Sequence, residues 1–484
     1  MDDTLLPGLP YSHEKDARFD GHFFRAILTT GIFCRPICPS RPARAENVLF
    51  FSTAAAAAEA GFRPCLRCRP ESAPDRPDGV GVSRLVRQAL RLIATGVASD
   101  ELPARLHISS RQLRRRFVQE LGTPPVAVSQ TRRLLFAKKL IDETDLPMTD
   151  LAFAAGYGSV RRFNAAIQQT YGRTPSAIRQ SRRQGTVTSE PGQLTLKLFY
   201  RPPYDWRAIW DYLALRATPG VEELTATSYR RLVVMAEASG VIELTPFPEE
   251  NFLRLQLPAS LSRHLLVITE RLKRLFDLRA DPALSGAVLD HDPLLAQIMT
   301  DRPGIRLPGA WDEFEVAVRI ILGQQVSVKG ATTLTGRLVS QFGSHHPQPD
   351  EATLAWQFPT PAQLVNGDIA SIGLPQKRAE TIRALAAAVL AGELEWHRPE
   401  ELAATEARLT ALPGVGPWTA QMIAMRALGE SDAFPAGDLV LRQAVAPPNS
   451  PPMPAQQLEK IAQYWRPYRA YAAQLLWVYQ SERR

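Results

Sequence analysis

The four cysteines of this 484-residue chain constrain its fold more than any other feature. They form two close pairs near the start of the sequence, Cys34 with Cys38 and Cys65 with Cys68. Two such pairs can supply four thiolates to one tetrahedral zinc ion. Four unrelated buried thiols are the alternative, but the pairing and the absence of any other cysteine favour a metal site. The sequence therefore predicts a small α+β domain with a Zn²⁺ site over residues 1–75.

Charge and hydropathy exclude several classes of protein. The net charge of +8 favours polyanionic partners. There is no run of about 18 apolar residues, so we expect no membrane span. The first ten residues lack the basic and then apolar pattern of a secretory signal, so we expect a cytoplasmic protein without a disulfide framework. We also expect a monomer.

Two stretches rich in proline, glycine and serine divide the chain and are predicted to be linkers, residues 69–82 and 181–193. Between them, residues 83–183 show helical spacing of apolar residues and hold most of the excess positive charge. Residues 190–295 are predicted to be α+β, and residues 296–484 to be all-α. The strand-like patches of the α+β segment are Leu194–Phe199, Val233–Ala236 and Leu253–Leu257. The predicted fold class is therefore multidomain and mainly α, with two α+β domains.

The basic middle segment contains a weak internal repeat. Leu102–Leu121 and Leu151–Tyr171 each read as a helix, a short turn and a second, basic helix. Ser109 or Ser110 can cap the second helix of the first copy, and Ser159 that of the second copy. Two consecutive helix-turn-helix elements are therefore predicted.

This segment resembles the AraC-type DNA-binding domain. The matching residues at its end are Gly156, Tyr157, Ser159, Phe163, Gly172, Thr174, Pro175 and Arg179, with Ile167 in place of an expected aromatic. The resemblance implies recognition helices over about 110–119 and 159–169, each in a major groove. Candidate DNA contacts are Arg111, Arg114, Arg115, Arg161 and Arg162. A basic helical bundle that reads no groove is the alternative.

The cysteine pairs lie in the strings FFRAILTTGIFCRPICPS, residues 23–40, and GFRPCLRCRP, residues 61–70. These closely resemble the N-terminal domain of the Ada adaptive-response family over about 60 residues. The resemblance implies that Cys34 accepts a methyl group from a methylated DNA phosphate and that all four cysteines bind zinc. A methyl phosphotriester is neutral, so four anionic sulfurs repel it less than an ordinary phosphate. Arginines expected to face phosphate are Arg35, Arg41, Arg44 and Arg67, although each could be a solvated surface charge.

A Pro-Gly-x-Gly hairpin lies in LPGVGPWTA, residues 412–420. Gly414 and Gly416 allow a tight turn whose backbone amides approach a phosphate closely. The acid that follows, Asp438, is predicted to start a helix. Taken alone, an aspartate there is most often only an N-cap, and the hairpin could be an ordinary turn.

Together, the hairpin and Asp438 resemble the helix-hairpin-helix glycosylases, specifically the AlkA-type 3-methyladenine glycosylases, over about 290 residues. Further matches are AVRIILGQQVS at 317–327, IGLPQKR at 372–378 and WRPYRAYAAQLLW at 465–477. The resemblance implies that Asp438 is the catalytic carboxylate. It also implies DNA contacts from Gln324, Gln325, Gly414 and Gly416, and a base pocket formed by Trp418, Trp477, Met422 and Leu439.

Three positions depart from the pattern of that family. Gln325 stands where the AlkA type has leucine, and Met422 and Leu439 replace aromatic residues. Trp418 stands where lyase relatives have a nucleophilic lysine, so we expect hydrolysis without strand cleavage. The two tryptophans would suit cationic alkylated purines through cation–π attraction, unless both are core residues.

The expected function is repair of alkylated duplex DNA combined with transcription regulation, with RNA polymerase as a further partner. Two alternatives stay open. One is a transcription regulator whose glycosylase half is inactive, and the other is a repair enzyme whose first half only delivers it to DNA. The Pro-Cys-His-Arg motif of an O6-methylguanine acceptor is absent from the sequence, so repair of that lesion is not expected.

Overall fold

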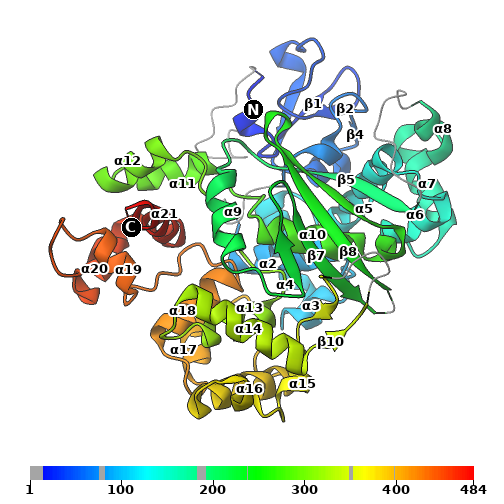
Figure 1. Cartoon of the computed structure of the whole chain (residues 1–484). Helices are drawn as coiled ribbons and strands as arrows, with labels where there is room; N and C mark the ends of the chain where they lie inside the picture. The colour runs from blue at the N-terminus through cyan, green and yellow to red at the C-terminus, as the bar shows by residue number, and fades with distance from the viewer. Residues whose placement is uncertain are drawn as a thin grey trace. The chain divides into compact units, whose positions relative to one another are not determined.

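The computed structural model describes residues 15–75, 82–181, 192–236, 238–347, 353–396 and 398–483 (Figure 1). The chain forms two compact units. The first comprises Met1–Pro202, Phe247–Glu270 and Leu278–Ala280, and the second comprises Pro203–Pro246, Arg271–Asp277 and Asp281–Arg484. Most of the two predicted linkers, residues 76–81 and 182–191, lies outside the described residues. No helix among the described residues is long and apolar enough to cross a membrane.

The first unit begins with a four-stranded sheet in the order β3-β1-β2-β4. Its strands are β1 (Phe24–Ile27), β2 (Ile32–Cys34), β3 (Val48–Phe51) and β4 (Arg63–Pro64), with helix α1 (Ala54–Glu59) packed against them. Strand β1 is antiparallel to β2 and β3, whereas β2 and β4 are parallel. Because β2 ends at Cys34 and Cys65 follows β4, the parallel pairing brings the two cysteine pairs to one end of the sheet.

Seven helices form the predicted helix-turn-helix segment. They are α2 (Arg84–Ala94), α3 (Leu102–Arg105), α4 (Ser110–Leu121), α5 (Pro125–Glu143), α6 (Met148–Ala154), α7 (Val160–Tyr171) and α8 (Pro175–Gln180). The Ser109 side chain accepts a hydrogen bond from the amide of Gln112, which completes a capping box at the start of α4. The Ser159 side chain accepts a hydrogen bond from the amide of Arg162 and so caps α7. Both predicted second helices and their caps are therefore confirmed.

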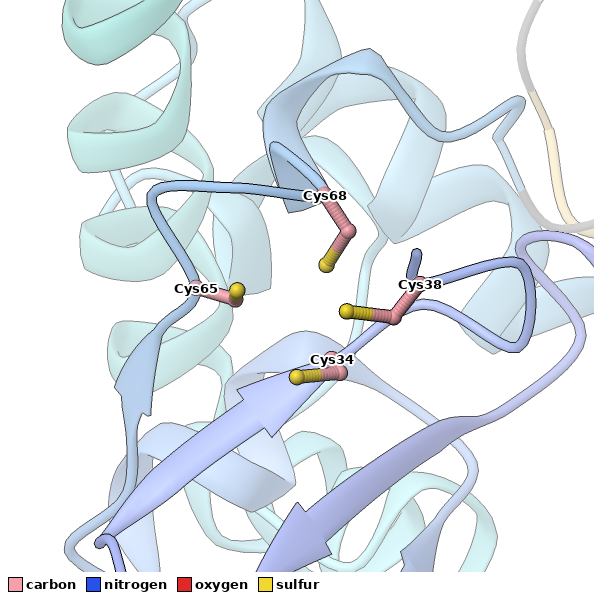
Figure 2. Close-up of side chains that lie close together, drawn as sticks. All are labelled: Cys34, Cys38, Cys65 and Cys68. Atoms are coloured by element: carbon pink, nitrogen blue, oxygen red, sulfur yellow. The ribbon is translucent and has the colours of Figure 1, made fainter. Parts of the chain in front are cut away.

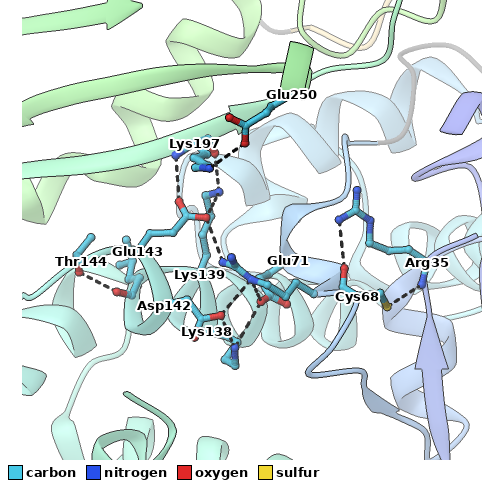
Figure 3. A network of polar contacts seen from close by, with 12 residues as sticks. Arg35, Cys68, Glu71, Lys138, Lys139, Asp142, Glu143, Thr144, Lys197 and Glu250 are labelled. Atoms are coloured by element: carbon cyan, nitrogen blue, oxygen red, sulfur yellow. Dashed lines mark hydrogen bonds and ion pairs between the residues drawn. The ribbon is translucent and has the colours of Figure 1, made fainter. Parts of the chain in front are cut away.

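The first unit also contains β5 (Gln193–Phe199), antiparallel to β9 (Phe252–Pro258), and the 3-10 helix η5 (Ala259–His264). Buried ionic groups join β5 to α5 (Figure 3). Glu143 accepts from the Lys197 amide at 3.0 Å, and Lys139 donates to the Lys197 carbonyl at 2.5 Å. At the end of β5, Arg201 is 1% exposed and donates to the carbonyls of Asp20 and Asp75 at 3.0 and 2.7 Å. The cysteine domain, α5 and β5 are therefore parts of one packed unit.

In the second unit, β6 (Glu222–Leu224), β7 (Tyr229–Met235) and β8 (Ala238–Phe247) form an antiparallel ladder. Helix α10 (Leu265–Leu275) starts in the first unit and ends in the second. All three predicted strand patches fall on strands except for the last residue of the second patch, Ala236, but β6 and β8 were not predicted. The sequence of β8 begins Ala-Ser-Gly and ends Thr-Pro-Phe, so turn-type residues conceal the buried alternation of its middle.

The rest of the second unit is helical, as predicted, apart from a two-stranded ladder of β10 (Ser344–His345) and β11 (Trp356–Gln357). Two hydrophobic cores hold it together, one around Ile321, Ile382 and Ile423, the other around Leu441 and Leu476. The helices are α9 (Trp206–Ala214), α11 (Pro282–Leu289), α12 (Pro293–Asp301), α13 (Glu313–Leu322), α14 (Val328–Phe342), α15 (Pro361–Leu364), α16 (Gln376–Leu390), α17 (Leu402–Thr410), α18 (Pro417–Arg426), α19 (Leu439–Ala444), α20 (Ala455–Ala462) and α21 (Arg469–Glu482).

Candidate functional site

The four cysteine sulfurs lie within 4.8 Å of one another, with their side chains turned toward a common centre (Figure 2). Four sulfurs about 2.3 Å from one tetrahedral zinc ion would be about 3.8 Å apart. The observed cluster is compact enough to close around such an ion with little rearrangement, and thiolates are ligands that zinc prefers. The predicted donor set therefore fits zinc.

Close contacts among the four thiols shift their pKa values in different directions. Hydrogen bonding with Cys34, and then with the other two cysteines, lowers the pKa of Cys38. The same kind of contact, again with Cys34 first, raises the pKa of Cys68. Neighbouring sulfurs cannot all become anionic unless a cation balances their charge. The cluster is therefore built for a bound cation, and a set of four thiolates calls for a soft divalent metal.

Cys34 differs from the other three cysteines in its exposure. It is partly exposed, whereas Cys38, Cys65 and Cys68 are 4%, 8% and 7% exposed. Cys68 Sγ accepts from the Arg35 amide at 3.3 Å, and Cys65 Sγ accepts from the Arg67 amide at 3.4 Å. Over the described residues, no backbone amide donates to Cys34 Sγ. Cys34 is therefore the most exposed cysteine of the cluster, and like Cys38 Sγ its sulfur accepts no backbone amide among the described residues.

Arg35 differs from expectation. It is 8% exposed and pairs with the Asp20 carboxylate, with one bond of 2.9 Å from its Nε. It also donates to the Cys68 carbonyl at 3.2 Å. Arg35 is thus a support of the cysteine cluster and does not face solvent. The other three predicted arginines, Arg41, Arg44 and Arg67, are exposed.

The two predicted recognition helices present arginines to solvent. Leu113 and Phe117 of α4 and Phe163 and Ile167 of α7 are buried in the interior. The arginines on the opposite faces are all exposed, namely Arg111, Arg114, Arg115, Arg161 and Arg162. The apolar face of each helix therefore packs in the interior of its domain, and its basic face is exposed to solvent. A helix inserted in a major groove needs such an exposed basic face.

The Pro-Gly-x-Gly hairpin connects α17 to α18. Gly414 has a φ of 80°, and Gly416 is the N-cap of α18, with Pro417 in its first turn. Gln324 lies in the loop between α13 and α14 and donates to the Gly414 carbonyl at 3.2 Å and to Thr419 Oγ1 at 2.9 Å. The loop that contains Gln325, which is exposed and has a φ of 56°, is therefore attached to the hairpin.

The two hairpin glycines are expected to differ in how much alanine destabilises the protein. A Cβ on Gly414 would lie 1.9 Å from Thr381 Oγ1, whereas one on Gly416 would meet nothing within 4 Å. With a positive φ as well, Gly414→Ala is expected to lower the free energy of unfolding by roughly 2–4 kcal/mol, and Gly416→Ala by less than about 1 kcal/mol. Urea unfolding followed by tryptophan fluorescence measures both. Equal losses would show that the hairpin is not packed as described.

Asp438 is the N-cap of α19, and four N–H groups hold its carboxylate. Oδ1 accepts from the amides of Val440 and Leu441 at 3.0 and 3.1 Å. The indole Nε1 of Trp477 donates to the same oxygen at 3.2 Å, and that of Trp418 donates to Oδ2 at 3.0 Å. Capping and catalysis are therefore compatible, because Oδ1 carries three donors while Oδ2 carries one and keeps a lone pair for another partner.

Of the four predicted pocket residues, the two tryptophans both contact Asp438, whereas Met422 and Leu439 are close to this group only along the chain. Trp418 and Trp477 flank Asp438 and are half-buried, but they donate indole N–H bonds, a role that the prediction of aromatic walls did not include. Met422 is half-buried one helical turn after Trp418, and Leu439 is 53% exposed beside Asp438. Arg426, which packs on Trp477, was not among the predicted residues. Nothing in the local pattern distinguishes it from a surface arginine.

Four family models match successive parts of the chain. They are the metal binding domain of Ada at residues 11–71, a helix-turn-helix domain at 102–181, the AlkA N-terminal domain at 195–312 and the HhH-GPD superfamily base excision DNA repair protein at 318–467. Together they cover the cysteine cluster, both recognition helices, the hairpin and Asp438. The four types of domain that the sequence resembles are therefore confirmed.

Similar proteins extend these matches. A protein of Mycobacterium tuberculosis named "probable bifunctional transcriptional activator/DNA repair enzyme AlkA" is 42% identical, over 96% of this chain and 94% of its own length. The "DNA-3-methyladenine glycosylase 2" of Escherichia coli is 34% identical, over 58% of this chain and 95% of its own. The solved 3-methyladenine DNA-glycosylase of Archaeoglobus fulgidus shares the fold, with a TM-score of 0.52 and 21% identity, over 59% of this chain and 98% of its own.

Proposed function

The chain belongs to the family of bifunctional transcriptional activator/DNA repair enzymes AlkA, and from this membership we propose that it removes alkylated purines such as 3-methyladenine from duplex DNA and accepts a DNA methyl group on Cys34. Its HhH-GPD domain is that of a DNA glycosylase, and its first two domains are those of an Ada-type, DNA-binding activator. As an activator it acts with RNA polymerase, and it does so as a monomer.

The observation that carries the glycosylase proposal is the Asp438 carboxylate held by two indole N–H groups beside the hairpin. Breaking an N-glycosidic bond leaves positive charge on the sugar, which a fixed carboxylate stabilises. Oδ2 has one donor, so it is the oxygen able to face the sugar or take a proton from the attacking water. The target base must leave the stack to reach it. Trp418 supplies no amine, so no covalent sugar adduct forms and the strand stays intact.

Cys34 carries the proposal of methyl transfer because it is the partly exposed sulfur of the cluster. Zinc, when bound by the four cysteines, keeps their sulfurs deprotonated at neutral pH. The Cys34 sulfur attacks the methyl carbon of a phosphotriester. The new S–C bond forms as the C–O bond breaks, and the oxygen keeps its electron pair, which regenerates an ordinary phosphate diester. Cys34 becomes a thioether, so each chain reacts once, and the lost negative charge strengthens binding to DNA.

The test of the glycosylase proposal separates base release from strand cleavage. Full-length protein is incubated with methylated duplex DNA, free bases are identified by mass spectrometry, and the strands are sized before and after alkali. We expect free alkylated purines and strands that break only in alkali. Strand breaks without alkali would contradict simple hydrolysis. No base release would favour a regulator with an inactive glycosylase half.

A further inference from the structure

Arg426, the last residue of α18, is a fully buried cation that contacts one of the two tryptophans bound to the candidate catalytic carboxylate. It is 2% exposed, and its guanidinium carbon lies 5.2 Å from the ring centroid of Trp477 and 4.7 Å from that of Tyr212. Both distances fall within the range of cation–π attraction, about 6 Å. The guanidinium therefore contacts the ring whose N–H group is bound to Asp438.

Two hydrogen bonds fix the plane of this guanidinium. Nη1 donates to the Pro308 carbonyl at 3.0 Å, and Nη2 donates to Gln474 Oε1 at 2.8 Å. Gln474 and Trp477 are three residues apart on α21, so they lie on the same face of that helix. Arg426 thus contacts one face of α21 at two places, the side-chain amide of Gln474 and the indole ring of Trp477.

Stability alone does not account for this arginine. Burial lowers its pKa, and although Asp277 is near enough to attract it, Arg426 forms no ion pair with a carboxylate of the described residues. Its Nε is buried without a hydrogen-bond partner. A desolvated cation with an unmet donor costs stability, and an apolar side chain of similar volume would often serve packing as well or better. An apolar residue would reproduce neither the two hydrogen bonds of the guanidinium nor its cation–π contact with Trp477.

We propose that Arg426 is a positioning residue of the glycosylase half, which holds the Trp477 indole at the angle where its N–H group meets Asp438 Oδ1. The inference rests on the proposed glycosylase activity, since Asp438 is the group whose orientation is controlled. If the indole turns away, Oδ1 loses one of its three donors and the carboxylate can rotate about its Cβ–Cγ bond. Small misplacements of a reacting group cost up to about 100-fold in rate.

The first test is the substitution Arg426→Lys, which keeps the charge but removes the flat, two-donor fork. We expect single-turnover base release to fall by about 10- to 100-fold, with little change in affinity for duplex DNA. Arg306→Lys is the matched control. Arg306 is 1% exposed, stacks on Tyr204 at 4.7 Å and donates to the Pro203 carbonyl. It should lose comparable packing and retain base release.

A double-mutant cycle separates positioning from general packing. In a Trp477→Phe background the N–H group is already gone, so Arg426→Lys should lower the rate by less than about twofold more. If the two losses instead multiply, Arg426 does not act through Trp477 and the proposal is overturned. If Arg426→Lys does not fold, Gln474→Met removes a single acceptor of the guanidinium and should show the same non-additivity in milder form.

The environment of the Trp477 indole can be measured by ¹⁹F NMR without any enzyme activity, so the positioning role of Arg426 can be tested separately from the proposed glycosylase function. With 5-fluorotryptophan in the eight tryptophans, the ¹⁹F resonance of Trp477 is assigned by its loss in Trp477→Phe. It should shift or broaden in Arg426→Lys and stay unchanged in Arg306→Lys. An unmoved Trp477 resonance would overturn the positioning role. A moved resonance in a protein that releases no bases would instead count against the glycosylase activity alone.

Discussion

Asp438→Asn is expected to lower the single-turnover rate of alkylated-base release by about 10²- to 10⁴-fold while α19 stays folded. Asparagine caps helices as well as aspartate does, and its oxygen can still accept from the amides of Val440 and Leu441. It has no charge to stabilise the sugar cation. The NH₂ group of the asparagine would replace Oδ2 and face the Trp418 indole N–H, so two donors would meet without an acceptor. The substitution therefore removes catalysis and keeps the cap.

The chain contains a close structural match for this control. Asp292 is the N-cap of α12, accepts from the amides of Leu294 and Leu295 at 3.0 and 3.2 Å, and accepts from the Trp465 indole at 3.1 Å. Asp292→Asn should therefore change stability about as much as Asp438→Asn and leave base release unaltered. If Asp438→Asn released bases at the wild-type rate, or if both variants lost activity equally, Asp438 would not be the catalytic carboxylate.

Cys34→Ala is expected to abolish methyl acceptance from methyl phosphotriester DNA while base release continues. Three thiolates remain, and zinc is often held by three protein ligands with water in the fourth position. Cys68→Ala is the contrasting variant, because Cys68 is 7% exposed and its sulfur is tied to the Arg35 amide. The Cys68→Ala protein should lose its bound zinc as well as its ability to accept a methyl group. Peptide mass spectrometry and zinc content measure the two effects. A methyl group found on Cys38 or Cys65 of Cys34→Ala would contradict the assignment.

Local patterns predicted the parts of the molecule that local chemistry determines. The cysteine pairs indicated a four-sulfur cluster, the serine caps indicated where α4 and α7 begin, and the hairpin was placed between two helices. Asp438 was placed correctly at the start of α19. The caps, the hairpin and the Asp438 N-cap depend on residues that are close in the sequence. The cysteine pairs are farther apart, but the chain has no other cysteines with which they could form a metal site.

Contacts between distant segments could not be predicted in this way. Arg35 belongs to a string that suggests a phosphate contact, yet its partner is Asp20. The tryptophans were predicted to flank a base, but no pattern indicates that their N–H groups meet one carboxylate. Arg426 depends on Gln474, which lies on another helix. Periodicity identifies which face of a helix is buried, but it does not identify which polar groups will meet there.

The most direct test of the whole account counts products per chain in one reaction between full-length protein and a methylated duplex. Free purines and the methyl content of the Cys34 peptide are measured over the same time course. The account predicts that alkylated purines accumulate well beyond one per chain, whereas methyl groups on Cys34 stop at one per chain. If purine release does not exceed the protein-free control and zinc-loaded Cys34 stays unmodified, neither site does the chemistry assigned to it.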